Sequence, residues 1–175
     1  MSEISASVST PAEHKAHAPR SVGCWVLTIS DSKTEATDTS GALIRELLAG
    51  AGHRVIGWGI VRDEPADVGQ LVRRACAHPD VQVVITTGGT GITTRDSTYE
   101  AIEALLDKRL PGFGELFRML SYQEVGPAAM LSRAQMGICA RRIVVSLPGS
   151  PNACRLAIEK LLNPELGHLV REVNR

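Results

Sequence analysis

Three aspartates, Asp31, Asp63 and Asp96, each come shortly after an apolar run that has the composition of a buried β-strand. Because the carboxyl ends of parallel strands share one edge of a sheet, we expect the three side chains at a common edge. Carboxylates gathered there could hold a divalent cation. Asp63 has a second interpretation: it precedes a predicted helix start at Pro65 and could cap that helix.

A glycine-rich loop, Thr87-Gly-Gly-Thr-Gly91, follows the third apolar run and leads into a predicted helix. Glycines leave backbone N–H groups open to a ligand, and a helix start favours negative charge, so the loop predicts a phosphate-binding site. A plain tight turn is the alternative. The loop has neither the G-x-G-x-x-G spacing of dinucleotide-binding proteins nor the G-x-x-x-x-G-K-S/T pattern of P-loop enzymes, which disfavours both classes.

A second loop of this kind, Pro148-Gly-Ser-Pro-Asn152, follows the last apolar run. Ser150 could cap the next helix, with Pro151 at its first position, and the same geometry would direct N–H groups at a ligand. Two anion-binding loops and nearby carboxylates predict a phosphorylated ligand together with Mg²⁺, which prefers a few carboxylates, waters and substrate phosphates.

Strands and amphipathic helices alternate from residue 22 onward, which implies right-handed crossovers, a mainly parallel sheet and the α/β class. The stretch 111–141 departs from this pattern; we expect a helix at 115–120 and a short irregular or antiparallel element there. The pattern Ser97-Thr-Tyr-Glu100 predicts a capping box, with Ser97 as the N-cap. The expected strands are 22–30, 54–61, 81–86 and 142–147, and the expected helices begin near Leu43, Pro65, Ser97 and Pro151.

Composition narrows the classes of function. The 175 residues are 43% hydrophobic and 22% charged, as in globular domains, and 19 basic residues balance 19 acidic ones. Without a basic excess, no nucleic-acid partner is expected. No apolar run approaches the ~18 residues of a membrane span, so no membrane partner is expected either. The four scattered cysteines form no C-x-x-C pair, which predicts reduced core residues, no zinc site and a cytoplasmic protein.

The chain is expected to form one domain with a tail. Residues 1–20 are rich in Ser, Ala, Pro and His and lack an apolar period. They predict a disordered N-terminal tail, or an arm that docks on a neighbouring subunit. Residues 21–175 are expected to form a single α/β domain, since no linker or repeat divides them.

Five segments occur together in a fixed order: Leu27-Thr-Ile-Ser-Asp-Ser32, Asp38-Thr-Ser-Gly41, Thr86-Thr-Gly-Gly-Thr-Gly91 with Arg95-Asp96, Pro111-Gly-Phe-Gly-Glu115 and Leu147-Pro-Gly-Ser-Pro-Asn-Ala153. Together they resemble the MoaB/MogA family of molybdenum cofactor biosynthesis proteins, to which the G domains of gephyrin and its plant counterpart are related. The resemblance runs from about Val22 to the C-terminus and is closest to the MoaB branch.

This resemblance implies a three-layer α/β sandwich, a molybdopterin-binding domain, and a homo-oligomer that is a trimer or a hexamer. It also implies transfer of an adenylyl group from ATP to molybdopterin with Mg²⁺, giving adenylyl-molybdopterin and pyrophosphate. Contacts with other enzymes of molybdenum cofactor synthesis are a further implied partnership. Residues that match Asp63 and Asp96 are the acidic residues linked to activity in the family.

The assignments that follow combine the motifs with this resemblance. Asp63 and Asp96 are predicted to be catalytic and to hold Mg²⁺, directly or through water. Glu100 is assigned to the capping box rather than to the ligand, and Glu115 and Arg118 to either the ligand or a subunit contact. Gly88, Gly89, Thr90 and Gly91 are predicted to hold a phosphate or the pterin, and the remaining predicted pocket residues are Ser30, Asp31, Ser121, Pro148, Gly149 and Ser150.

Two other functions remain open at this point. The first is a catalytically silent protein of the MoaB type, which holds molybdopterin or a partner without chemistry. Retention of Asp63 and Asp96 argues against it. The second is an enzyme related to the competence-damage proteins, which process pyridine nucleotides on a similar fold; the segment Met119-Leu-Ser121 fits the MoaB branch better.

Overall fold

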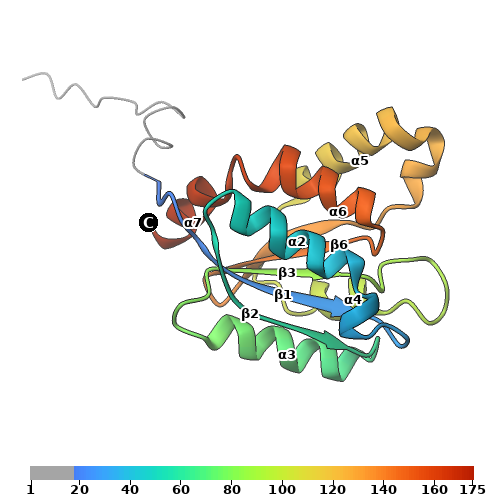
Figure 1. Ribbon diagram of the computed structural model, residues 1–175, viewed down its shortest axis with the longest axis horizontal. Coiled ribbons are helices and arrows are strands. Elements are labelled where there is room, and N and C mark those ends of the chain that lie inside the picture. The colour runs from blue at the N-terminus through green and yellow to red at the C-terminus, as the bar shows by residue number, and fades with distance from the viewer. Residues whose placement is uncertain (1–17) are drawn as a thin grey trace, which may run out of the picture.

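The computed structural model describes residues 18–175, in which one six-stranded sheet lies between two layers of helices (Figure 1). The strands are β1 (Gly23–Ile29), β2 (Arg54–Val61), β3 (Val83–Thr87), β4 (Lys108–Arg109), β5 (Gln135–Cys139) and β6 (Arg142–Leu147). The helices are α2 (Thr39–Gly50), α3 (Pro65–Ala77), α4 (Thr98–Glu103), α5 (Pro111–Val125), α6 (Pro151–Ala157) and α7 (Leu166–Asn174). Shorter turns are η1 (Glu35–Thr37), η2 (Gly126–Leu131) and the π-helical η3 (Ile158–Leu162).

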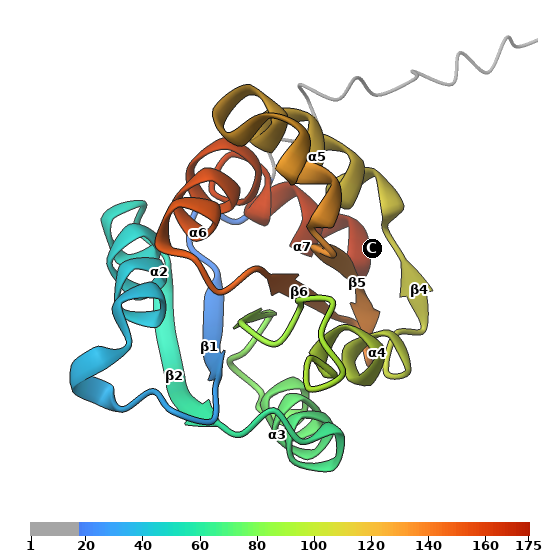
Figure 2. The ribbon, with the colours of Figure 1, turned by 90° about the vertical axis from the view of Figure 1, so that its right-hand side faces the viewer.

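The strand order is β2-β1-β3-β6-β5-β4. Strands β2, β1, β3 and β6 pair in parallel, whereas β5 runs antiparallel to β6, and β4 antiparallel to β5. This confirms the predicted α/β class with a mainly parallel sheet, and β5 is the antiparallel element expected within 111–141. All four parallel strands therefore end at the same edge of the sheet, and this edge faces the viewer in Figure 2.

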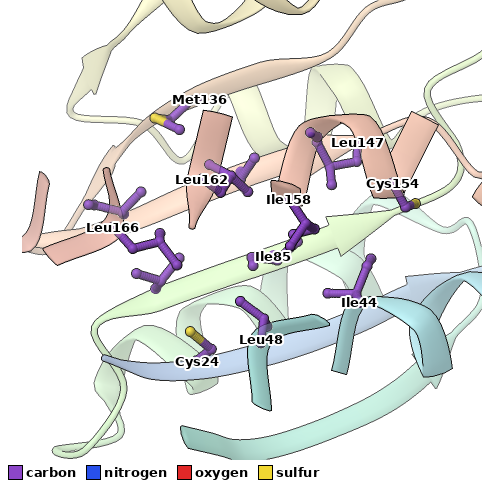
Figure 3. Packing of buried hydrophobic residues seen from close by; sticks show 14 of the residues in the cluster. Cys24, Ile44, Leu48, Ile85, Met136, Leu147, Cys154, Ile158, Leu162 and Leu166 are labelled. Carbon is purple, nitrogen blue, oxygen red and sulfur yellow. The ribbon is translucent and has the colours of Figure 1, made fainter. Parts of the chain in front are cut away.

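Each face of the sheet has its own hydrophobic core. Side chains alternate between the faces along a strand, so Val83 and Ile85 of β3 pack on one side and Val84 on the other. The first core is completed by α2, α5, α6, η3 and α7, and Figure 3 shows its centre around Ile85 and Ile158. The second core is completed by α3 and α4. Full burial of one such side chain stabilises the fold by roughly 1.5–3 kcal/mol.

Helix α5 is longer than the sequence indicated, because it begins at Pro111 rather than near Glu115. Two glycines in its first turn argue against a helix on propensity alone, although Pro111 suits the first helical position. Phe113 overrides that weakness: it is buried against the sheet and stacks on Phe117, with ring centroids 6.3 Å apart. Burial of these two rings outweighs the poor helix propensity of the first turn.

The four cysteines are free and buried, which confirms their predicted place in the core. Burial raises the pKa of the Cys24 thiol to about 12, so this side chain stays a neutral thiol near neutral pH. Among residues 18–175, no helix combines the length and the apolar character that a membrane crossing requires. The predicted tail, residues 1–20, lies mostly outside the described residues; of its described part, residues 18 and 19 lie against Gly167 of α7.

Candidate functional site

A cleft of about 480 Å³ opens at the carboxyl-end edge of the sheet. One wall is the loop after β3, a second is the loop after β6, and the third is formed by the end of α5 with η2. The structure therefore brings together most of the predicted pocket residues. Those that line the cleft are Gly88, Gly89, Thr90, Gly91, Asp96, Ser121, Pro148, Gly149 and Ser150.

The loop after β3 can be built only with glycine at its first two positions. Gly88 has φ +101° and Gly89 has φ +62°, both in the region that side chains disfavour. A Cβ on Gly88 would collide with the backbone of Ile29, and one on Gly89 with the side chains of Thr98 and Asp63. In this loop, neither the N–H of Gly89 nor that of Thr90 donates a hydrogen bond within residues 18–175.

Hydrogen bonds lock the two glycine loops together behind the cleft. The N–H of Gly88 donates to the carbonyl of Leu147 at 3.0 Å, and the hydroxyl of Thr87 donates to the carbonyl of Pro148 at 3.0 Å. Ser40, at the start of α2, donates to the carbonyl of Gly149 at 2.8 Å. The two loops thus form a single frame, which is suited to holding a ligand in a fixed orientation.

Ser150 caps α6 as predicted. Its hydroxyl accepts a hydrogen bond from the N–H of Ala153 at 3.3 Å, and Pro151 stands at the first helical position. Ser150 also lines the cleft, so the capping and pocket interpretations hold together.

Asp96 is the aspartate of the three that lines the cleft. One of its oxygens accepts hydrogen bonds from the hydroxyl of Thr93 at 2.6 Å and from the N–H of Thr93 at 3.0 Å. The Thr93 hydroxyl is the largest influence that holds the pKa of Asp96 below its ordinary value. The carboxylate is therefore ionised at neutral pH, as a cation ligand must be.

Asp63 is buried, with 6% of its surface exposed, and is not among the residues that line the cleft. Its Oδ1 accepts from the hydroxyl of Ser97 at 2.9 Å, the N–H of Ser97 at 3.3 Å and the hydroxyl of Thr98 at 3.2 Å. These bonds tie the end of β2 to the start of α4. The N-cap position of α3 is Glu64, whose side chain makes no capping bond, so the capping interpretation of Asp63 does not hold for that helix.

The capping box predicted at the start of α4 was wrong. Ser97 is the N-cap residue, but its side chain makes no capping bond, because its hydroxyl donates to Asp63 instead. Glu100 forms an ion pair with Arg133 rather than returning to the N-cap. Burial acts to raise the pKa of Glu100, but the bonds from its own N–H and from Arg133 outweigh burial and lower that pKa.

Asp31 and Ser30 lie beside the cleft and not in its lining. Asp31 accepts from the N–H of Asp63 at 3.2 Å and forms an ion pair with Arg95, at 2.8 Å, and Arg95 also pairs with Glu64 at 2.8 Å. The hydrogen bond from Arg95 lowers the pKa of Asp31. The three aspartates thus gather at one edge as predicted, with Asp31 and Asp63 bonded to residues of the loop and Asp96 lining the cleft.

Ser30 lines a separate hollow of about 140 Å³, which shares Gly88 and Gly149 with the cleft. The same hollow is lined by Asp38, a residue that the sequence analysis did not assign to the site. Asp38 is 3% exposed, accepts from the hydroxyl of Thr28 at 2.8 Å and caps α2 through the N–H of Gly41. The pattern Asp-x-x-Gly before an apolar helical stripe was the available signal for this cap.

Glu115 and Arg118 lie outside the cleft. Both line a neighbouring hollow of about 230 Å³, which α5 forms with residues of α4 and β5. Arg118 donates to the carbonyl of Ser132 at 3.4 Å, and Ser132 lines the cleft. Arg118 therefore supports one wall of the cleft from behind.

The cleft fits a magnesium ion better than a metal held by protein alone. No group of three or more histidine, cysteine or acidic side chains that could enclose a metal occurs in the part of the chain that is described. Mg²⁺ does not need one, because it binds through one or two carboxylates, several waters and substrate phosphates. The ionised Asp96 supplies one such carboxylate at the cleft.

Comparison with known proteins agrees with this geometry. Residues 25–168 match the family model described as a probable molybdopterin binding domain. The chain is 54% identical to molybdenum cofactor biosynthesis protein B of Bacillus cereus, over 93% of this chain and 97% of that protein. A crystal structure of a molybdenum cofactor biosynthesis protein B, 54% identical, superposes with a TM-score of 0.88 over 90% of this chain and 99% of that one. The tungsten cofactor synthesizing protein MoaB from Pyrococcus furiosus, 41% identical, gives 0.80 over 90% of this chain and 100% of that chain.

Proposed function

Because this chain belongs to the MoaB family of molybdenum cofactor biosynthesis proteins, we propose that it adenylylates molybdopterin with ATP and Mg²⁺. An oxygen of the molybdopterin phosphate forms a bond to the α-phosphorus of ATP. The bond between that phosphorus and the oxygen leading to the β-phosphate breaks, and pyrophosphate leaves with the electron pair. The products are adenylyl-molybdopterin and pyrophosphate.

The observation that carries this proposal is the pair of glycine loops around one cleft. Gly89 and Thr90, whose N–H groups donate no hydrogen bond within residues 18–175, line one wall, and Gly149 and Ser150 line another. Two phosphate-bearing substrates repel each other, so a site for them must offer donors on more than one side. The fixed frame of the two loops supplies the alignment on which phosphoryl and adenylyl transfers depend.

The residues of the cleft have positioning and electrostatic tasks rather than proton transfer. The molybdopterin phosphate is already anionic near neutral pH, so its attack needs no general base. When bound, Mg²⁺ would neutralise charge on the departing pyrophosphate. We assign its protein ligand to Asp96. Asp63 we assign to positioning, since it fixes Ser97 and Thr98, the residues directly after Asp96.

The test measures adenylyl-molybdopterin and pyrophosphate made from molybdopterin, ATP and Mg²⁺ by the purified protein. The Asp96→Asn variant is expected to lose roughly 100-fold in turnover, the usual cost of losing one electrostatic contact to the transition state. Asp63→Asn keeps an oxygen that can accept the same three hydrogen bonds and is expected to lose far less. Asp80→Asn, at the opposite edge of the sheet, is the matched control and should behave as wild type.

The outcomes separate the two candidate roles of this protein. A loss in Asp63→Asn as large as that in Asp96→Asn would make Asp63 a direct Mg²⁺ ligand. No product from the wild type, with molybdopterin binding retained, would overturn the adenylyltransferase. The chain would then be a silent molybdopterin-binding protein. This second candidate is favoured by the observation that, of the three aspartates, only Asp96 lines the cleft.

The surface of α5 and η2 supports the homo-oligomer implied by the family. Several large apolar side chains are exposed there, at helical spacing along α5 and on the following turn. Contiguous apolar surface of this kind is typical of protein–protein contacts. The exposed residues are Leu116, Met119, Tyr122, Val125, Met130 and Leu131.

A further inference from the structure

Arg133 joins the two ends of the loop that carries Asp96. It lies between η2 and β5, and it is not among the residues that line the cleft. Its Nε donates to the carbonyl of Thr90 at 3.0 Å, and its Nη2 donates to the carbonyl of Asp96 at 3.4 Å. One side chain therefore contacts the backbone at both ends of the segment 90–96.

Two further contacts hold the guanidinium group itself in place. Its Nη1 donates to the carboxylate of Glu100, and its central carbon lies 5.1 Å from the ring centroid of Tyr99. Both partners belong to α4, the helix that the loop enters. About a quarter of the Arg133 side chain is exposed, so these bonds are partly shielded from water. The loop, the helix and Arg133 thus form one connected unit.

Other contacts also anchor the loop. Residues 91–95 are exposed, and the bonds between Thr93 and Asp96 lie within the loop itself, so they shape it without anchoring it. The external anchors are the bond from Thr98 to Gly89, the bonds to Asp63, the ion pair of Arg95 with Asp31, and Arg133. Of the two arginines, Arg95 is the more exposed, at 55% against 25% of the side chain, and its bonds to Asp31 and Glu64 hold the outer side of the loop.

An arginine is needed for the contacts that Arg133 makes. Its planar group carries five N–H donors in a fixed fork, so it can reach two carbonyls and a carboxylate at the same time. A lysine brings the same charge to a single nitrogen and cannot span these three acceptors together. The geometry therefore depends on the shape of the guanidinium and not only on its charge.

We infer that Arg133 is a positioning residue, which fixes the loop 90–96 so that the carboxylate of Asp96 faces the cleft. The effect of Arg133 on catalysis rests on the proposed function. Its effect on the position of the loop 90–96 does not. Arg133 also connects the loop to the opposite wall, because the adjacent Ser132 and Leu131 line the cleft. Without Arg133, the loop would be less rigid, and the distance between the two walls of the cleft would be less fixed.

The first test measures amide hydrogen exchange in the segment 91–97 of the full chain, which requires no activity. In Arg133→Gln, exchange is expected to accelerate by roughly tenfold or more, the factor that a 1.4 kcal/mol change produces in an opening equilibrium. Arg133→Lys should fall close to Arg133→Gln, because the fork is lost in both. Arg171→Gln, at a similarly exposed arginine of α7, is the matched control and should exchange as wild type.

The second test measures adenylylation against Mg²⁺ concentration. Arg133→Gln is expected to raise the half-saturating Mg²⁺ concentration by roughly 10- to 100-fold, as the loss of a group that orients a metal ligand typically does. The KM for molybdopterin should change much less, which a general loss of structure would not produce. Glu100→Gln keeps an acceptor oxygen but removes the negative charge that pairs with Arg133, and should give a smaller effect in the same direction.

Unchanged exchange in Arg133→Gln would overturn the inference, and so would wild-type exchange in Arg133→Lys, since charge alone would then suffice. If the wild type makes no product, the proposed function fails, while the exchange result still decides whether Arg133 holds the loop. If the loop opens but the Mg²⁺ dependence is unchanged, Arg133 has no positioning role toward Asp96, and the inference is again overturned.

Discussion

The two loops that form the cleft are held by different means. The loop 148–152 is held by uncharged groups: Ser150 caps its own helix, and the hydroxyls of Thr87 and Ser40 donate to the carbonyls of Pro148 and Gly149. The loop 88–96 is held by charged side chains from elsewhere in the chain, chiefly Asp63 and Arg133. The first loop is short and enters a helix at once, whereas the second is long and largely exposed.

The two loops contribute different properties to the site: the loop 148–152 contributes a rigid frame, and the loop 88–96 contributes the charge of Asp96. A loop closed by a cap and by neutral hydroxyl donors needs no ionised group, so it offers a fixed frame for a ligand that is already anionic. A loop that must present a carboxylate cannot bury that group, and it needs external anchors that are themselves charged. The consequences can be measured by parallel substitutions in the two loops.

The largest expected effect comes from a methyl group at Gly89. Gly89→Ala forces a side chain into left-handed backbone and into the space of Thr98 and Asp63, and should lower the free energy of unfolding by about 3 kcal/mol. Gly149→Ala is the parallel change in the other loop. Its Cβ would make ordinary contacts, the nearest to the Cα of Gly88 at 3.4 Å, so little loss is expected. Urea unfolding of both variants measures the difference, and equal losses would contradict the contrast between the loops.

The next effect concerns the anchors. Asp63→Ala leaves the two donors of Ser97 and the hydroxyl of Thr98 without their acceptor, and should lower the free energy of unfolding by about 2 kcal/mol. Ser150→Ala removes a single cap and should cost about 1 kcal/mol. The comparison is made by urea unfolding at neutral pH. A larger loss in Ser150→Ala than in Asp63→Ala would show that the local cap, and not the distant carboxylate, is the stronger anchor.

The same contrast explains what the sequence could predict. The cap at Ser150, the start of α6 at Pro151 and the parallel strands follow from local signals, which spacing and residue type reveal. The glycine loop was also predicted to bind the ligand, and Asp96 was predicted to be catalytic and to hold Mg²⁺. The bond from Ser97 to Asp63 and the role of Arg133 were not, because each joins positions more than 30 residues apart. Local rules assigned Ser97 and Glu100 to a capping box, and more distant charged partners displaced that arrangement.

The smallest expected effect is a difference in pH dependence. The hydrogen bond from Thr93 lowers the pKa of Asp96 in the folded protein, so the ionised form is favoured by folding. Its contribution to stability is therefore complete above the pKa of an unfolded aspartate, about 3.9, and is lost as pH falls through and below that value. Asp96→Asn should remove part of the decline in unfolding free energy between pH 6 and pH 3. The loop 148–152 contains no carboxylate, so the loss caused by Ser150→Ala should be the same across that range. Unfolding curves at several pH values measure both contributions. If the contribution of Ser150 to the free energy of unfolding fell with pH as that of Asp96 does, both loops would depend on the same charges.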